Sequence, residues 1–330
     1  MSERKSYAIF AITKHGLTHA QRLAAQLPDA DVYVSEKLLA RARTEHGLTA
    51  AIPLGLPMGP TLARVFTLYD CHVFVISVGA VVRMVAPLLQ NKKVDPAVLC
   101  VDDAARFAIC VLSGHVGRGN HFTERVAQLL GATPVITTAS DVLGTLTVDI
   151  LGRELGWRLE DQDRNVTRGC AAVVNQTPVL IVQETGEPEF WPLHEPLPPG
   201  VRYTTRLADI DPAAWEILLI VSDRVLGVEH AALLERGIVY RPRSLVLGAG
   251  CDRDTPPELF ERGVLSALAR AGLSPKSLHS LASIDKKRDE PAMLRFAERY
   301  GLALAFYSAE QLDAVSGIQN PSAMVQKHVG

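Results

Sequence analysis

Cysteine is scarce in this sequence of 330 residues, and the few cysteines present are not spaced for a crosslink or a metal site. They stand at positions 71, 100, 110, 170 and 251, an odd number with no Cys-x-x-Cys pair. Disulfide frameworks use even numbers of cysteines and zinc ribbons use close pairs, so the pattern argues against both. We therefore expect a protein of the reducing cytosol.

Long apolar runs and a strong net charge are also missing. No stretch is long and apolar enough to span a bilayer, and the polar segment Met1 to Ser6 does not lead into a signal-peptide core. The formal net charge of -2 creates no field that would attract nucleic acid. A small anion remains an eligible ligand, because a few local Arg and Lys side chains suffice to bind one. We expect a cytoplasmic protein that binds neither membrane nor nucleic acid.

Aromatic residues make up only 6% of the sequence, whereas hydrophobic residues make up 48%, so the cores must be mainly aliphatic. Aliphatic runs typical of buried parallel strands alternate with turns and amphipathic helices up to about residue 141, and again from residue 245. This alternation predicts a multi-domain α/β fold with mostly parallel sheets flanked by helices. We expect a Rossmann-like N-terminal part and a three-layer α/β/α C-terminal domain.

The middle of the chain is less regular and suggests the domain limits. We place an N-terminal domain at 1–141, a central or linker domain at 142–241 and a C-terminal domain at 242–330. A helix is expected over 146–155, while five prolines between 187 and 200 exclude regular structure there. Arg241-Pro242-Arg243 is interpreted as a hinge.

Three polar clusters directly follow predicted strands: Ser77-Val78-Gly79, Ser113-Gly114-His115 and Thr137 to Asp141. Ligands of open α/β sheets bind at the carboxyl ends of strands, where helix N-termini offer free N–H groups. Glycines within and after the first two clusters let a ligand approach the backbone closely. Each cluster alone is better explained as a tight turn, because such turns are common. Together they predict that the three clusters converge at one edge of a single sheet.

His115 is the one histidine inside these glycine-rich turns, and a histidine can exchange protons at neutral pH. It is a candidate general base, with a hydrogen-bonded structural histidine as the alternative. Asn120 is expected to cap the helix that follows. His15 and His19 are four residues apart, but Gly16 lies between them and no zinc-protease pattern follows, so a metal site there is the weaker interpretation.

Two further motifs are incomplete. Gly248-Ala249-Gly250 follows a strand, but Arg253 stands where a dinucleotide fingerprint has its third glycine. Ser283-Ile284-Asp285-Lys286 matches the Ser-x-x-Lys of acyl-enzyme hydrolases without the partner motifs. A Ser–Lys hydrolase centred on Ser283 therefore stays an open alternative.

Several longer strings occur in a characteristic order and resemble one family. They are Gly79-Ala80-Val81-Val82-Arg83, Ala86-Pro87-Leu88-Leu89, Lys92, Asp95-Pro96-Ala97-Val98, Leu112-Ser113-Gly114-His115, Gly119-Asn120, Gly131 to Ala139, Leu247-Gly248-x-Gly250-Cys251-x-Arg253, Thr255-Pro256, Leu281-Ala282-Ser283-Ile284-Asp285-x-Lys287 and Asn320-Pro321-Ser322. This combination resembles the cobalamin biosynthesis protein CbiG family, the cobalt-precorrin-5A hydrolases of the anaerobic route. The matching parts are about 73–141 and 245 to the end.

The resemblance implies three α/β segments, the last shared with a small stand-alone protein of the corrinoid pathway. It implies hydrolysis of the ring-A lactone of cobalt-precorrin-5A, with release of acetaldehyde and formation of cobalt-precorrin-5B. Members of the family usually continue further past Asn320-Pro321-Ser322, so we expect a C-terminal domain that is either naturally short or a truncated or divergent form. Members of the family often have Gly-Gly-Ala-Asn after the Ser-Gly-His turn, whereas this chain has Gly117-Arg118-Gly119-Asn120, so Arg118 departs from the pattern.

With this reaction, the catalytic candidates are His115, Asp141 and Ser113. His115 or Asp141 would act as the base, and backbone N–H groups around Gly114 to Gly119 would stabilise the oxyanion. The expected substrate-binding residues are Ser77, Gly79, Arg83, Lys92, Gly114, Gly117, Arg118, Asn120, Thr137, Thr138, Gly250, Arg253, Ser283 and Lys287.

No cofactor and no metal ligand of the protein itself is expected, because the resemblance places the cobalt in the substrate. The expected partner is a small-molecule cobalt corrinoid, and a homodimer or transient contact with neighbouring pathway enzymes is compatible with it. The alternative from another functional class is a non-catalytic carrier of a corrinoid intermediate. Release of acetaldehyde distinguishes the enzyme from the carrier.

Overall fold

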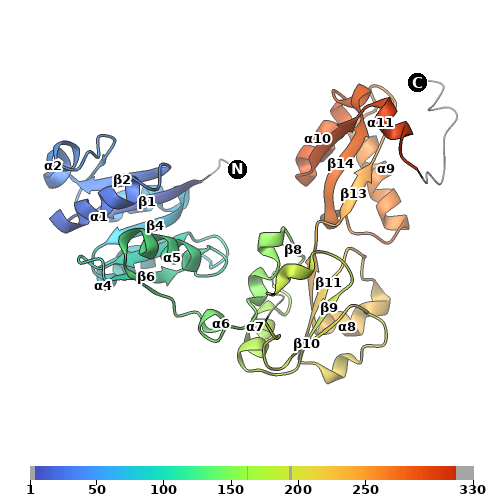
Figure 1. Cartoon of the computed structure of the whole chain (residues 1–330), viewed down its shortest axis with the longest axis horizontal. Helices are drawn as coiled ribbons and strands as arrows, with labels where there is room; N and C mark the ends of the chain where they lie inside the picture. The colour runs from blue at the N-terminus through green and yellow to red at the C-terminus, as the bar shows by residue number, and fades with distance from the viewer. Residues whose placement is uncertain (1–3, 162, 193–194, 317–330) are drawn as a thin grey trace. The chain divides into compact units, whose positions relative to one another are not determined.

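A computed structural model describes residues 4–161, 163–192 and 195–316, and these form three separate β-sheets (Figure 1). Two compact units are distinguished, Met1–Thr147 with the first sheet and Val148–Gly330 with the other two. The sheets are mostly parallel and flanked by helices, which confirms the predicted fold class. The division into three domains at 141 and 241 stays a prediction. Asn320-Pro321-Ser322 lies outside the described residues.

The first unit is built on a seven-stranded sheet in the order β3-β2-β1-β4-β5-β6-β7. Its strands are β1 (Lys5–Ala11), β2 (Ala30–Ser35), β3 (Ile52–Leu54), β4 (Tyr69–Val75), β5 (Ala97–Val101), β6 (Phe107–Leu112) and β7 (Thr133–Val135). Five residues connect β5 to β6, too few for a parallel crossover, so β6 runs antiparallel to β5. β7 is parallel to β6. The carboxyl ends of β6 and β7 therefore lie at the opposite edge of the sheet from those of β1 to β5.

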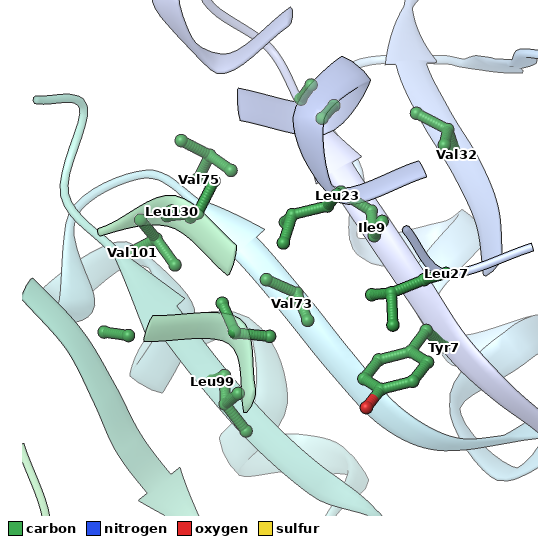
Figure 2. Packing of buried hydrophobic residues seen from close by; sticks show 14 of the residues in the cluster. Tyr7, Ile9, Leu23, Leu27, Val32, Val73, Val75, Leu99, Val101 and Leu130 are labelled. Atoms are coloured by element: carbon green, nitrogen blue, oxygen red, sulfur yellow. The ribbon is translucent and has the colours of Figure 1, made fainter. Parts of the chain in front are cut away.

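Helices cover both faces of this sheet, which explains why its strands are continuous aliphatic runs. They are α1 (Lys14–Ala24), α2 (Leu39–Thr44), α3 (Gly59–Val65), α4 (Val78–Val85), α5 (Gly119–Leu130) and the short α6 (Ala139–Val142). Side chains of α1 and α5 pack on one face, and those of α3 and α4 on the other. Figure 2 shows the first of these cores, where Leu23 of α1 and Leu130 of α5 lie near Val73 and Val75 of β4.

The second unit begins with a five-stranded sheet in the order β10-β9-β11-β12-β8. Its elements are β8 (Arg158–Leu159), α7 (Val166–Val174), β9 (Val179–Gln183), β10 (Val201–Thr204), β11 (Ile217–Val221), α8 (Ala231–Glu235) and β12 (Gly237–Arg241). The helix expected over 146–155 is wrong. Only two 3₁₀ turns form there, because Gly152 and Gly156 adopt positive φ angles of 69° and 79°, which a continuous helix does not allow.

The third sheet has the parallel order β13-β14-β15. Its elements are β13 (Leu245–Gly248), α9 (Pro257–Arg270), β14 (Leu278–Ile284), α10 (Pro291–Tyr300), β15 (Ala303–Tyr307) and α11 (Ala309–Asp313). Phe260 of α9 and Phe296 of α10 are in edge contact at 5.7 Å between ring centroids, so both helices cover the same face. This follows from right-handed crossovers between adjacent parallel strands. Helices α9 and α10 thus form one layer against this sheet.

The segment Arg241-Pro242-Arg243 is held by hydrogen bonds and is not the free hinge expected. Arg241 is buried, forms an ion pair with Glu160 and donates to the carbonyl oxygen of Ser222. Arg243 donates to the carbonyl oxygens of His279 and Gly301, at 3.1 and 2.7 Å. A segment whose guanidinium groups are bound on both sides cannot rotate without breaking these bonds.

Candidate functional site

The carboxyl ends of β6 and β7 carry a cluster of polar side chains centred on His115 and Asp141, which we call the His115 site. His115 Nε2 lies 2.6 Å from Asp141 Oδ2 and 3.1 Å from Ser140 Oγ. The loop after β6 positions the imidazole, and α6 after β7 positions the carboxylate. Because the two strands are adjacent and parallel, residues that are 26 apart in sequence meet at one edge of the sheet.

Asp141 receives three hydrogen bonds in all, which keep it ionised. Besides His115, the donors are Thr138 Oγ1 at 2.6 Å and Asn120 Nδ2 at 3.0 Å. Partial burial favours the neutral acid, but the hydrogen bonds from Thr138 and His115 outweigh it and lower the pKa of Asp141. A carboxylate held in this way is a weak base. In this geometry the carboxylate can orient the imidazole and favour its protonated form.

The loop before α5 is compact and requires glycine. A Cβ on Gly117 would lie 2.5 Å from Ser113 Cβ, and one on Gly119 would lie 2.8 Å from the Leu112 carbonyl oxygen. Ser113 and Arg118 adopt positive φ angles of 58° and 61°. These features describe a tightly wound turn that holds His115 in place.

The backbone N–H groups at the start of α5 are already used inside this loop. Those of Arg118, Gly119 and Asn120 donate to the carbonyl oxygens of residues 115, 113 and 114, at 2.9 to 3.0 Å. The prediction that amides across Gly114 to Gly119 hold an oxyanion is therefore wrong for Arg118 and Gly119. The tight turn itself is the cause, because it closes only when these amides bond back to the loop.

Asn120 and Ser113 have roles other than those expected. The helix begins two residues earlier, at Gly119 with Arg118 at its N-cap, so Asn120 is not the cap. Its side chain instead donates to Thr138 and Asp141, and Gly114 leaves room for it. Ser113 Oγ donates to the carbonyl oxygen of Asp95 at 3.0 Å, which ties the loop to the start of β5.

The Ser77 cluster lies at the other edge of the sheet, so the predicted convergence of all three clusters is wrong. Ile76 accepts a hydrogen bond from Cys100 near the end of β5, whereas Ser113 bonds to Asp95 before β5 begins. Gly79 and Arg83 belong to α4, which starts at the Ser77 edge, and they bond to each other at 2.8 Å. The reversal of β6 is the physical reason.

The remaining N-terminal candidates are solvent-exposed. Lys92 and Thr137 are exposed, as is Arg118. The Arg118 guanidinium lies over the Phe122 ring, 5.9 Å from its centroid. These side chains are accessible to a ligand.

A second His–Asp pair lies at the Ser77 edge and was missed, because His15 and Asp103 are far apart in sequence. His15 Nδ1 is 2.8 Å from Asp103 Oδ2, and Thr13 Oγ1 donates to Asp103 Oδ1 at 2.5 Å. His15 and Asp103 border a surface hollow of about 410 Å³ lined also by Thr18, His19 and Ala104. The hydrogen bond from Thr13 is the main cause of the lowered pKa of Asp103. Across the described residues, no three His, Cys, Asp or Glu side chains are grouped to hold a metal ion.

The candidates of the last sheet lie at the carboxyl ends of β13 and β14. Ser283 is buried, and its Oγ donates to the carbonyl oxygen of Ala249 at 2.8 Å, which argues against a nucleophile. Gly250 is exposed. Arg253 donates to Asp289 at 2.7 Å, and Lys287 Nζ lies 3.6 Å from Glu290 Oε2.

Comparison with protein families matches three models in succession along the chain. Cobalamin synthesis G N-terminal matches residues 60–141, the cobalamin biosynthesis central region matches 146–242, and cobalamin synthesis G C-terminus matches 245–330. In the part of the chain that the structure describes, no helix is both long and apolar enough to cross a membrane.

Curated relatives match along nearly the whole chain. A cobalt-precorrin-5A hydrolase of Priestia megaterium is 38% identical over 333 residues, covering 100% of this chain and 87% of the relative. A cobalt-precorrin-5A hydrolase of Salmonella typhimurium is 32% identical, covering 99% and 88%. Among solved structures, a putative cobalamin biosynthesis protein G homolog from Sulfolobus solfataricus is 16% identical, covering 97% and 86%, with a TM-score of 0.40.

Proposed function

The chain belongs to the cobalamin synthesis G (CbiG) family, and from this premise we propose that it hydrolyses the ring-A lactone of cobalt-precorrin-5A, releases acetaldehyde and yields cobalt-precorrin-5B. The observation that supports this most directly is the match along the whole chain to two cobalt-precorrin-5A hydrolases. The His115 site supplies the acid–base chemistry that lactone opening requires.

In this proposal His115 is the general base and Asp141 positions it. When Nε2–H donates to Asp141, the neutral ring takes up a proton at Nδ1. His115 removes a proton from water as the water oxygen attacks the lactone carbonyl carbon. The tetrahedral intermediate then expels the ring oxygen, which leaves a carboxylate and an oxygen on the two-carbon unit. Asp141 stabilises the imidazolium that forms in the attack step.

Acetaldehyde leaves in a second step. The released oxygen loses its proton and forms the carbonyl of acetaldehyde, while the bond between that carbon and the macrocycle breaks. The electron pair of this bond passes to the electron-poor macrocycle, so water is consumed and no external oxidant or reductant is needed. We propose no cofactor and no metal of the protein's own, because the cobalt arrives with the substrate.

The substrate contacts of the first unit in this proposal lie around His115. Gly114 and Gly117 allow backbone approach next to His115, while Thr138 and Asn120 act through Asp141. Ser113 acts as a loop anchor, given its bond to Asp95. The exposed guanidinium of Arg118 is suited to a peripheral carboxylate. Cytoplasmic location and transient contact with neighbouring pathway enzymes remain part of the proposal.

A single-turnover assay for acetaldehyde with cobalt-precorrin-5A tests the function. We expect one acetaldehyde per corrinoid from the unaltered protein, roughly 10²- to 10⁴-fold slower release from His115→Asn, and little change from Ser283→Ala. Corrinoid binding without acetaldehyde would establish the carrier alternative. A covalent adduct on Ser283, lost in Ser283→Ala together with activity, would establish the Ser–Lys hydrolase.

A further inference from the structure

Glu290, at the N-terminus of α10, is fully buried, with 0% of its surface exposed. Within the described residues neither carboxylate oxygen has a hydrogen-bond partner. It does not cap α10 with its side chain. Burying a carboxylate without a hydrogen bond is costly unless cations compensate for its charge.

Two cations from different loops provide that charge. Lys287 Nζ lies 3.6 Å from Glu290 Oε2, and Arg253 Nη1 lies 3.9 Å from the same oxygen. Both distances permit strong attraction but exceed a hydrogen bond. The charge of Glu290 therefore attracts both the Lys287 ammonium and the Arg253 guanidinium, while their N–H groups form no hydrogen bond with it.

Both cations lie beside a part of the sheet that a ligand can reach. Arg253 follows β13 and Lys287 follows β14, two adjacent parallel strands whose carboxyl ends share one edge. A Cβ added at Gly248 or Gly250 would meet nothing within 4 Å, so the backbone beside them is open. The bond from Ser283 to Ala249 joins the two loops.

Asp289 shows how a carboxylate binds there. It is 77% exposed, and its Oδ1 accepts a hydrogen bond from Arg253 Nη1 at 2.7 Å. An exposed side chain held by one such pair contributes little to stability and is easily replaced. A ligand carboxylate can take its place and reach Lys287 as well.

From this geometry we infer that Arg253 and Lys287 form a binding site for a peripheral carboxylate of the corrinoid, and that Glu290 is the buried residue that positions them. The inference rests on the proposed function for the identity of the ligand. It assigns to Glu290 a role that exposure and motif matching do not suggest, since a buried residue never contacts the substrate.

The test uses the full chain and two stable cobalt corrinoids that undergo no lactone chemistry. Cobyrinic acid carries free peripheral carboxylates, and cobinamide carries amides in their place. We expect the unaltered protein to bind cobyrinic acid at least tenfold more tightly than cobinamide, measured by absorbance titration. Arg253→Gln and Lys287→Met should each weaken cobyrinic acid binding about tenfold and leave cobinamide binding unchanged.

Glu290→Gln and Asp289→Asn are matched, because each removes one negative charge from the same cluster. We expect Asp289→Asn to tighten cobyrinic acid binding two- to threefold, since it removes a competitor. Glu290→Gln should weaken cobyrinic acid binding three- to tenfold. The cluster becomes more positive in this variant, but Arg253 and Lys287 are no longer held in position. If both variants tighten binding equally, Glu290 only neutralises charge, and the positioning role is wrong.

Glu290→Asp provides a second measurement, because it keeps the negative charge but shortens the side chain by one methylene group. It should weaken cobyrinic acid binding about threefold and leave cobinamide binding unaltered. Unchanged affinity in this variant would also overturn the positioning role. Failure of the proposed function is detected separately, since acetaldehyde release plays no part in these titrations.

Discussion

The first sheet carries two His–Asp pairs at opposite edges, and their surroundings differ sharply. The His115 side chain is 19% exposed, and its Asp141 partner has two further donors. The His15 side chain is 78% exposed, and Asp103 is itself half exposed. Solvent screens the second pair strongly, so its attraction does not hold the orientation of the His15 ring firmly. A short His–Asp distance alone therefore does not identify a catalytic pair.

The two His–Asp pairs also differ in which strands they follow. Ligands of parallel sheets usually bind at the carboxyl ends of the strands, which would favour His15. In this sheet the two reversed strands, β6 and β7, create a second set of carboxyl ends at the other edge. The first prediction decides between the two edges.

The largest expected effect comes from removing each histidine in turn. His115→Ala should lower kcat for acetaldehyde release by roughly two to four orders of magnitude, the usual value of a positioned general base. His15→Ala should change kcat less than threefold, because His15 is solvent-exposed. Steady-state kinetics with equal amounts of folded protein provides the measurement. The reverse result would move the active site to the edge of Thr13, His15 and Asp103.

Exchanging each aspartate for asparagine tests whether catalysis requires the carboxylate to orient its histidine ring. Asp141→Asn should lower kcat roughly 10²- to 10³-fold, because an amide stabilises neither the required tautomer nor the imidazolium. Asp103→Asn should leave kcat within about twofold. If Asp141→Asn keeps its kcat while His115→Ala does not, His115 acts without a positioning partner.

A third histidine of the same sheet, His72, is buried and bonds to a backbone carbonyl oxygen, whereas His115 and His15 bond to carboxylates. It is fully buried, its Nε2–H donates to the Phe66 carbonyl oxygen at 2.8 Å, and its ring stacks on that of Phe66. Burial lowers the pKa of His72 to about 4, against 6.5 for an ordinary histidine. The unfolded chain therefore binds the proton more readily than the folded one between these two pH values.

The sign of the effect follows from this difference. Stability is fully present above pH 6.5 and falls as the pH drops towards 4, by about 2 kcal/mol between pH 7 and pH 5. Urea unfolding of the isolated chain at several pH values measures this slope. His72→Phe should remove about 2 kcal/mol of the decline, whatever its effect at pH 7. An unchanged slope would mean that His72 is protonated in the folded state.

Local patterns in the sequence were sufficient for much of the fold. Aliphatic runs that alternate with turns and helices up to about residue 141, and again from residue 245, predicted α/β structure, and strands and helices do alternate in both stretches. The helix expected over 146–155 was wrong because Gly152 has a positive φ angle. The N-cap role of Asn120 was wrong because its side chain bonds to Asp141, which is distant in sequence. Glu290 had no sequence signal, because a glutamate among lysines and arginines is ordinarily a solvated charge.

The sequence by itself determined the strand, turn and helix segments and the glycine-rich loop around His115, because periodicity and glycine requirements act over a few residues. Tertiary structure decided which residues share an edge. The antiparallel pairing of β5 with β6 separated Ser77 from His115 and brought Asp141 to it, since strand direction sets where each carboxyl end lies. Pairing of strands is a long-range interaction, and so is the placement of Arg253 and Lys287 beside one buried carboxylate.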